Sequence, residues 1–347
     1  MRNFEKIFSK SNNSTYIISE IGVNHNGDLG LAKKMIDQSI ECGADAVKFQ
    51  AFIAENIVLK NAEKANYHKV NTPKDETHFE MLKNLELDKN GHLILKNYCD
   101  ENNIDFFSTP YDIDSVEMLE SISVSHYKTA SADLVDLTLH ERIAKTKKPV
   151  IISVGMATID EISETIDLYK RYKSDNIALL HCVSNYPCSL ESLNMKVIKS
   201  LEKTFNIPVG FSDHSEGYQA SISAVSLGSK IIEKHFTSDK SLIGPDHKAS
   251  SDPKEFYALV DSIRKTEKIL GSEDKKIQKE ELDNRKISRK SITLSQSIPK
   301  DTPITRDMLT MKRPGIGLKA NMIEKILGKR TLKDLEKNHQ ISLDDID

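Results

Sequence analysis

The chain has 347 residues, with 49 Lys and Arg against 52 Asp and Glu and a net charge of -3. This balance lacks the basic excess of a general nucleic-acid binder, and no apolar run approaches the roughly 18 residues of a membrane span. The start, MRNFEKIFSKSNNSTY, lacks the apolar core of a signal peptide, and the four cysteines include no C-x-x-C pair. We therefore expect a cytoplasmic globular protein with reduced cysteines, whose partners are small molecules or protein rather than nucleic acid or membrane.

Eight short β-branched or apolar runs alternate with amphipathic stretches up to about residue 270. They predict strands at Tyr16–Asn24, Ala46–Phe52, Asp105–Pro110, His126–Ser131, Pro149–Gly155, Ile177–Val183, Pro208–Asp213 and Lys230–Phe236. Eight strand–helix repeats indicate the α/β class, with a (β/α)₈ TIM barrel over residues 1–271. A doubly wound sheet is the alternative, but EIGVNHNGDLG at the end of the first run does not contain the G-x-G-x-x-G fingerprint.

Three further segments differ in length or composition from the strand–helix repeats. Residues 53–103 are too many for one crossover and contain a charged helix around HFEMLKNLELDKNGHLILKNYC, which predicts a lid or rim over the barrel mouth. Residues 272–285 read as a charged linker. Beyond it, SITLSQSI, a turn at PKDTP, MLTMKRPGIG and a short helix around NMIEKIL predict a small β-rich domain at 286–347.

Polar residues end nearly every expected strand, and TIM barrels carry their functional groups at these carboxyl ends. Lys48 and Lys128, on separate strands, can cradle a phosphate or carboxylate together with serine hydroxyls. The serines are Ser131, Ser153, Ser184 and Ser212. The alternative is that each lysine extends to solvent and each serine caps a helix.

Two histidines belong to neighbouring strands, because His214 follows one strand and His235 ends the next. Together they can bind one divalent cation, with water or substrate in the remaining positions, although two structural histidines explain the spacing equally well. His25, His181 and His247 are weaker candidates. Glu20 and Glu233 are the carboxylates available for proton transfer or for orienting a metal ligand, with ion pairs to lysine as the alternative.

Eight motifs occur in one order over nearly the whole chain: EIGVNHNGDLG, GADAVKFQ, FFSTPYD, SVGMATIDEI, LHCVSNYP, GFSDHSEG, IEKHFTSDKSLIGPDHKAS and KRPGIG. Together they resemble the bacterial sialic acid synthase family. The resemblance implies condensation of phosphoenolpyruvate with an N-acetylated mannosamine-type sugar to a nine-carbon 2-keto-3-deoxy sugar acid. It also implies a divalent metal, Mn²⁺ or Mg²⁺, and a barrel followed by an antifreeze-like (SAF, β-clip) domain in a domain-swapped homodimer.

The resemblance also implies roles for individual residues. His214 and His235 match the metal ligands, and both lysines and all four serines named above match phosphoenolpyruvate contacts. Catalytic roles fall on Glu20 and Glu233, and contacts to the acceptor sugar fall on Gln50, Tyr186, Asp246 and Arg313. Of these, Arg313 matches an arginine that reaches from the SAF domain into the partner's barrel.

The chain departs from the family pattern at several positions. TASADLVD has Ala132 and Asp133 where relatives usually have Gly-Glu, and Ser184 stands where relatives have Asn or Thr. In the SAF domain, Asp301 and Asn338 replace turn glycines. Asp and Asn tolerate a left-handed backbone better than most residues, so we expect these turns to persist.

Three functions compete. The first is an N-acetylneuraminate synthase that uses N-acetylmannosamine, and the second is a legionaminic acid synthase that uses 2,4-diacetamido-2,4,6-trideoxymannose. VKFQAF and GPDHKAS resemble these two branches more than the pseudaminic acid branch. The third is a non-catalytic sugar-binding or regulatory barrel, against which the presence of both histidines, both lysines and Arg313 argues.

Overall fold

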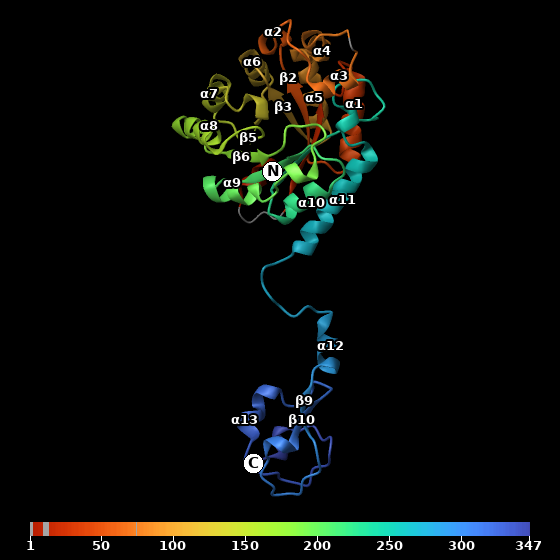
Figure 1. Cartoon of the computed structure of the whole chain (residues 1–347), viewed down its shortest axis with the longest axis vertical. Coiled ribbons are helices and arrows are strands. Elements are labelled where there is room, and N and C mark those ends of the chain that lie inside the picture. Colours follow the sequence, from red (N-terminus) through yellow and green to blue (C-terminus); the bar gives the residue numbers. More distant parts are fainter. Residues whose placement is uncertain (1–2, 10–13, 74) are drawn as a thin grey trace. The chain divides into compact units, whose positions relative to one another are not determined.

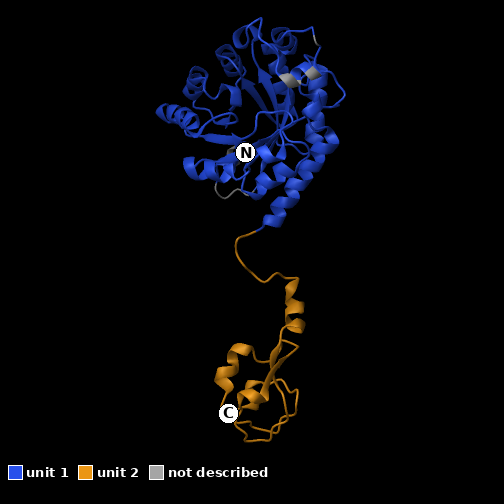
Figure 2. Ribbon diagram, viewed as in Figure 1, with its two compact units in different colours: residues 1–271 blue, residues 272–347 orange. Residues whose placement is uncertain are grey.

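The computed structural model describes residues 3–9, 14–73 and 75–347, and it consists of two compact units, residues 1–271 and 272–347 (Figure 2). In the first unit eight parallel strands form a nearly closed barrel, in the hydrogen-bonded order β3-β2-β1-β8-β7-β6-β5-β4 (Figure 1). The strands are β1 (Tyr16–Gly22), β2 (Ala46–Ala51), β3 (Asp105–Pro110), β4 (Tyr127–Thr129), β5 (Val150–Ser153), β6 (Ile177–His181), β7 (Val209–Asp213) and β8 (Ile231–His235). The predicted TIM barrel is therefore confirmed, and the doubly wound alternative is wrong.

Helices connect successive strands and cover the outside of the barrel (Figure 1). They are α1 (Leu29–Glu41), α5 (Lys89–Glu101), α6 (Ile113–Ser121), α7 (Leu137–Thr146), α8 (Ile159–Arg171), α9 (Val197–Phe205), α10 (Gln219–Ser226) and α11 (Pro253–Leu270). Their starts follow from local sequence: in α8, Thr158 and Glu161 form a reciprocal capping box. Short 3-10 turns lie at Ser131–Asp133 (η2), Leu190–Ser192 (η3) and His247–Ala249 (η4).

Alternation along the strands divides the apolar residues between two cores. Ile17 of β1 and Ile232 of β8 belong to the core between strands and helices. Their neighbours Ile18 and Ile231 belong to a second cluster, which Phe4 of the 3-10 helix η1 (Asn3–Phe8) joins. The same alternation continues toward the carboxyl ends of these strands. There the side chains on the inner face of the barrel are polar instead of apolar.

The long segment between β2 and β3 forms three extra helices, α2 (Ala54–Ile57), α3 (Asn66–Asn71) and α4 (His78–Leu85). The single charged helix predicted here is wrong, because α4 and α5 are separate helices. Thr77 and Glu80 form a capping box that starts α4, and the Asp88 carboxylate accepts a hydrogen bond from Gly91 N at the start of α5.

The second unit contains helix α12 (Glu281–Ser288), an antiparallel pair, β9 (Ser291–Leu294) with β10 (Leu309–Lys312), and helix α13 (Ile323–Ile326). The 3-10 turns are η5 (Arg306–Met308), η6 (Ala320–Met322) and η7 (Leu343–Asp345). Its core includes Ile292, Leu294, Ile326 and Ile341. Asp301 and Asn338 adopt φ angles of 62° and 73°, which confirms the expected left-handed turns.

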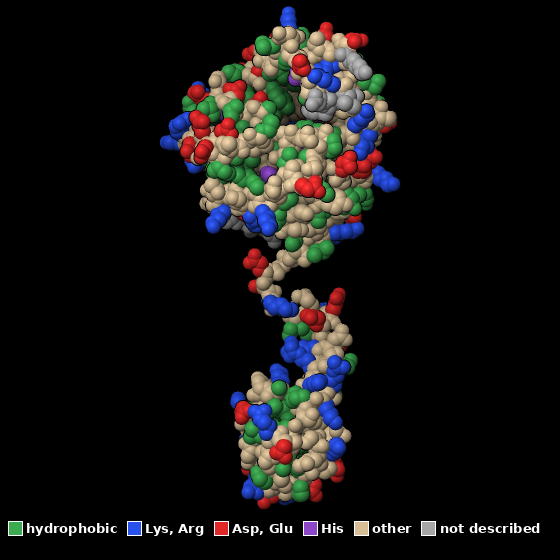
Figure 3. All heavy atoms as spheres, in the orientation of Figure 1, with side chains coloured by type: hydrophobic (Ala, Val, Ile, Leu, Met, Phe, Trp, Pro, Cys, Tyr) green, Lys and Arg blue, Asp and Glu red, His purple; other side chains and the backbone are tan. Residues whose placement is uncertain are grey.

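The surface agrees with the nearly balanced charge of the sequence. Acidic and basic side chains are interspersed over the visible face of the barrel unit (Figure 3). None of the helices in the described part of the chain combines the length and hydropathy needed to cross a bilayer.

Candidate active site

A cavity of about 440 Å³ lies where the carboxyl ends of the barrel strands meet. All the site residues predicted from the sequence line it, except Arg313, which belongs to the second unit. They are Glu20, Lys48, Gln50, Lys128, Ser131, Ser153, Ser184, Tyr186, Ser212, His214, Glu233, His235 and Asp246. The weaker candidates His25, His181 and His247 are not among the lining residues.

Strand register explains why these side chains meet. Glu20 of β1 is aligned with Lys48 of β2 on one side and with His235 of β8 on the other. Ser212 of β7 is aligned with Glu233 of β8. Aligned residues of neighbouring parallel strands point to the same face of the sheet. The strands β2, β1, β8 and β7 are neighbours in the barrel, so these five polar groups all lie on its inner face, close together.

The two lysines and two glutamates form a buried ionic network. Lys48 Nζ lies 2.6 Å from Glu20 Oε2 and donates to Thr109 Oγ1 at 3.1 Å. Lys128 Nζ donates to Ser153 Oγ at 2.6 Å and lies 3.6 Å from Glu233 Oε1. Both lysines are almost fully buried, so the alternative in which they extend to solvent is wrong. The ion-pair alternative for the glutamates is correct, and the same groups still line the cavity.

The environment separates the acidities of the two glutamates. Burial raises the pKa of Glu20 above its ordinary value, although Lys48 acts in the opposite direction. Burial also opposes ionisation of Glu233, but the ammonium groups of Lys128 and Lys48 outweigh it and lower its pKa. Two carboxylates with pKa values moved in opposite directions are suited to different proton-transfer roles.

Hydroxyl groups crowd the end of the cavity beside Lys128. Ser131 Oγ accepts a hydrogen bond from Gly155 N at 3.0 Å and lies 3.0 Å from Cys182 Sγ. A Cβ added at Gly155 would lie only 2.5 Å from Ser184 Oγ, so only glycine at position 155 lets the three side chains converge. Sequence reasoning missed Gly155 and Cys182, because their importance depends on contacts between different strands.

The two histidines lie close together with neutral rings. Their ring centroids are 5.7 Å apart, and the Tyr186 ring lies 4.2 Å from that of His214. Burial lowers the pKa of His214 to about 4 and that of His235 well below its ordinary value. His214 Nδ1 lies 2.8 Å from the Val183 carbonyl oxygen, so with the proton on Nδ1 its Nε2 presents a lone pair.

These features fit a divalent cation. His235 Nδ1 is buried without a hydrogen-bond partner, and the nearest carboxylate oxygen, on Asp246, is 4.0 Å away. Among the described residues no group of three or more His, Cys, Asp or Glu side chains has the arrangement of a metal site. Two histidines alone leave the other coordination positions to water or substrate.

One flank of the cavity is apolar. Together with Tyr111, six aliphatic, Met or Phe residues form a hydrophobic cluster separate from the barrel cores, and every member lines the cavity: Val23, Phe52, Ile57, Met81, Leu82 and Leu85. We call these six residues the apolar wall. Helix α4 contributes Met81, Leu82 and Leu85 together with His78, a spacing of i, i+3, i+4 and i+7 that places all four on one helix face. The segment between β2 and β3 is therefore a rim of the cavity, as predicted.

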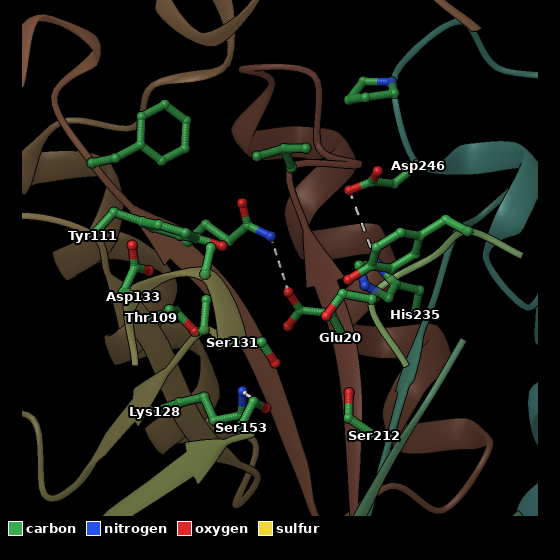
Figure 4. A pocket seen from close by; sticks show the side chains of 18 of the residues that line it. Glu20, Thr109, Tyr111, Lys128, Ser131, Asp133, Ser153, Ser212, His235 and Asp246 are labelled. Atoms are coloured by element: carbon green, nitrogen blue, oxygen red, sulfur yellow. Dashed lines mark hydrogen bonds and ion pairs between the residues drawn. The ribbon is translucent and has the colours of Figure 1, made fainter. Parts of the chain in front are cut away.

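Asp133 faces the same cavity. Figure 4 shows Asp133, Thr109 and Tyr111 on one side, His235 and Asp246 on the opposite side, and Lys128 and Ser153 at the floor between them. The Asp133 Oδ2 atom is buried and has no hydrogen-bond partner. Burial, with a smaller contribution from Asp136, raises the pKa of Asp133 to about 7.

The fold and this cavity define a TIM-barrel enzyme joined to a small SAF unit. Residues 35–275 match the family described as NeuB, and residues 289–347 match the SAF domain. The chain belongs to the NeuB family. The resemblance drawn from the motifs is thereby confirmed, as is the enzyme class, a synthase of nine-carbon sugar acids.

Individual relatives match over nearly their whole length. An N,N'-diacetyllegionaminic acid synthase of Legionella pneumophila is 44% identical over 329 residues, 94% of this chain and 92% of the relative. An enzyme of the same name from Campylobacter jejuni is 42% identical, over 94% of this chain and 98% of the relative. The crystal structure of N-acetylneuraminic acid synthetase from Leptospira borgpetersenii, in complex with citrate, superposes with a TM-score of 0.69 at 36% identity, covering 79% of this chain and 91% of that one.

Proposed function

We propose that the protein condenses phosphoenolpyruvate with the open-chain aldehyde of an acetamido sugar, giving a nine-carbon 2-keto-3-deoxy sugar acid and phosphate. The observation that carries the proposal is one cavity with two buried lysines among hydroxyl groups at its floor and two neutral histidines at its side. Lys48 and Lys128, with Ser131, Ser153, Ser184 and Ser212, hold the phosphate and carboxylate of phosphoenolpyruvate. Gln50, Tyr186 and Asp246 contact the acceptor sugar.

His214 and His235 are the residues that would hold a divalent metal, Mn²⁺ or Mg²⁺. When bound, such an ion supplies Lewis-acid polarisation of the acceptor's carbonyl oxygen. The protein's own contribution is to hold the two reactants together, so that the methylene carbon of phosphoenolpyruvate faces the aldehyde carbon.

The carbon–carbon bond forms from the enol double bond, and the aldehyde oxygen takes up a proton. Water then adds to the second carbon of the former phosphoenolpyruvate and loses a proton. The resulting tetrahedral intermediate collapses to the ketone, expels phosphate with cleavage of the carbon–oxygen bond and releases the proton of its hydroxyl group, which balances the proton taken up by the aldehyde oxygen. We assign the proton from water to Glu20, because its raised pKa moves proton exchange toward neutral pH, with Glu233 as second choice.

Release of phosphate tests this function. Purified protein with phosphoenolpyruvate and manganese is assayed with N-acetylmannosamine and, separately, with 2,4-diacetamido-2,4,6-trideoxymannose. We expect chelator-sensitive phosphate release with at least one sugar. The absence of phosphate release with both sugars would overturn the function and favour a non-catalytic sugar-binding barrel. In the productive reaction, ¹⁸O in the bridging position of phosphoenolpyruvate must leave with the phosphate.

The diacetamido sugar, 2,4-diacetamido-2,4,6-trideoxymannose, is a separate candidate acceptor, because the Legionella and Campylobacter relatives are named for diacetylated products.

We also propose a domain-swapped homodimer in which Arg313 contacts the acceptor in the partner's barrel. Arg313 is exposed within its own unit and donates from Nε to Ser288 O, so part of its guanidinium is available. Mixed dimers of an R313A chain and an H235A chain should recover one functional site, whereas sites built within one chain would give none.

A further inference from the structure

The segment between β8 and α11 carries Asp246, and it leaves and returns at His235. Two backbone hydrogen bonds close its base: Ser251 N donates to His235 O at 2.8 Å, and Thr237 N donates to Ser251 O at 3.0 Å. We call residues 237–250 the Asp246 loop. Resting on the proposed function, in which Asp246 contacts the acceptor, the position of this loop decides where a carboxylate meets the acceptor.

Asn24 joins the two ends of the Asp246 loop. It follows β1, in which Glu20 is aligned with His235 of β8. The Asn24 side chain is fully buried, and its amide nitrogen donates to Phe236 O at 2.9 Å and to Ser250 Oγ at 2.8 Å. Of the uncharged side chains, only the primary amides offer two hydrogens from one nitrogen. One side chain therefore ties the outgoing end of the loop, next to His235, to the returning end at Ser250.

Ser250 passes this constraint on to Asp246. Its hydroxyl group accepts the hydrogen bond from Asn24 and donates to Asp246 O at 2.7 Å, and Ser250 N donates to the same carbonyl at 3.1 Å. Figure 4 shows Asp246 directed toward His235, whose Nδ1 lies 4.0 Å from Asp246 Oδ2 and has no hydrogen-bond partner among the described residues. This gap is too long for a hydrogen bond, so both groups stay available to a ligand.

Other contacts keep the Asp246 loop folded independently of Asn24. His247 Nδ1 lies 2.7 Å from Thr237 Oγ1, and both residues are fully buried. Asn26 Nδ2 donates to Ile243 O at 2.9 Å. Loss of the link through Ser250 should therefore free Asp246 to move without unfolding the loop.

We propose that Asn24 and Ser250 are positioning residues for Asp246, which hold its carboxylate beside His235 before the acceptor binds. A group fixed in advance loses less conformational freedom on binding, so the acceptor binds more tightly. Phosphoenolpyruvate is assigned to the lysines and serines of the cavity, so its binding should not depend on these two residues.

S250A tests the proposal, because it removes the hydroxyl group that links Asn24 to Asp246 and leaves the backbone hydrogen bonds in place. At saturating phosphoenolpyruvate and manganese, we expect kcat/KM for the acceptor to fall about 3- to 10-fold, the range of one buried hydrogen bond. The KM for phosphoenolpyruvate and the affinity for Mn²⁺, measured by electron paramagnetic resonance, should stay unchanged. N24D, which removes both donors at the other end of the link, should lower the same kcat/KM.

A double-mutant cycle separates positioning from a merely structural role. D246N should lower kcat/KM for the acceptor, and S250A should add little in the D246N background, because the carboxylate that it positions is gone. S251A is the matched control, since Ser251 is buried like Ser250 but joins the loop through its backbone. It should leave kcat/KM for both substrates unchanged, and thermal unfolding identifies any variant that is misfolded.

Three results would overturn the positioning role while the synthase function stands. They are an unchanged kcat/KM for the acceptor in folded S250A, an equal fall for both substrates, and a full additional effect of S250A in the D246N background. Absence of turnover by the wild type with either sugar overturns the synthase function and the positioning role with it.

Discussion

Lys128 Nζ lies 2.6 Å from Ser153 Oγ, and both side chains are buried at the floor of the cavity. The same ammonium group is 3.6 Å from Glu233, so it sits between a carboxylate of the protein and the space assigned to phosphoenolpyruvate. Burial lowers the pKa of Lys128, but the carboxylate of Glu233 acts in the opposite direction and favours the charged form. A charged ammonium group in this place suits an anionic substrate.

Replacing Lys128 by Met keeps most of the side chain but removes that charge. We expect kcat/KM for phosphoenolpyruvate to fall by about 10- to 150-fold, the equivalent of the roughly 1.5–3 kcal/mol of a hydrogen bond to a charged group. Initial rates at varied phosphoenolpyruvate measure it. K148M is the control, because Lys148 pairs with Glu120 at the outside of the barrel. An unchanged kcat/KM in K128M would exclude Lys128 from the substrate site.

Replacing His235 should weaken metal binding without unfolding the protein. Its Nδ1 has no hydrogen-bond partner, so H235Q removes a ligand without breaking a hydrogen bond made by that atom. We expect Mn²⁺ affinity to fall at least tenfold, measured by electron paramagnetic resonance of the free ion, and turnover to be lost. Wild-type protein stripped by a chelator should regain activity with Mn²⁺, and H235Q should not regain it at the same concentration. Full activity of H235Q would contradict its assignment as a ligand.

Asp345 should make the stability of the second unit dependent on pH. It is 2% exposed, accepts hydrogen bonds from His339 Nε2, Ser342 N and Ser342 Oγ, and pairs with Lys333. Burial opposes its ionisation, but these partners outweigh burial and hold its pKa below the ordinary value of 3.8. Since the folded pKa is the lower one, the stabilisation is fully present above about pH 5 and is lost as the pH falls below 4.

D345N should therefore destabilise this unit by about 1–3 kcal/mol at pH 7, the cost of weakening buried hydrogen bonds to a charged group. Hydrogen exchange in peptides that contain Ile341 and Ile346 measures the effect in the full chain. The difference from the wild type should shrink at pH 3. A difference that stays constant from pH 7 to pH 3 would contradict the ionised state of Asp345.

Phe4 closes the end of the barrel opposite the cavity. Its ring stacks on His126 at 4.0 Å and meets Phe107 edge-on at 5.4 Å. F4A should lower the free energy of unfolding of the barrel by about 3 kcal/mol, as for other buried phenylalanines, without changing the KM for either substrate. Urea unfolding measures it. F8A is the matched comparison and should cost less, because Phe8 is only partly buried.

The amino-acid sequence alone determined the eight strands and the polar residues at their ends. Both depend on local patterns: alternation along each strand marks Lys48 and Gln50, or Glu233 and His235, as neighbours on one face. The motifs, which are local as well, identified the family. Left-handed turns at Asp301 and Asn338 were predictable for the same reason, because a backbone conformation depends mainly on the residue that adopts it.

Only the tertiary structure decided which other side chains face the polar residues at the strand ends. The split between α4 and α5 has a local signal, the Asp88 cap at the start of α5, which the prediction of a single helix did not use. Nothing in the sequence of α4, however, indicates that Met81 and Leu85 line the cavity rather than pack against the barrel. Likewise, the need for glycine at position 155 arises from Ser184, on another loop. Such contacts join residues far apart in the chain, so they depend on how whole elements pack, and no local pattern records them.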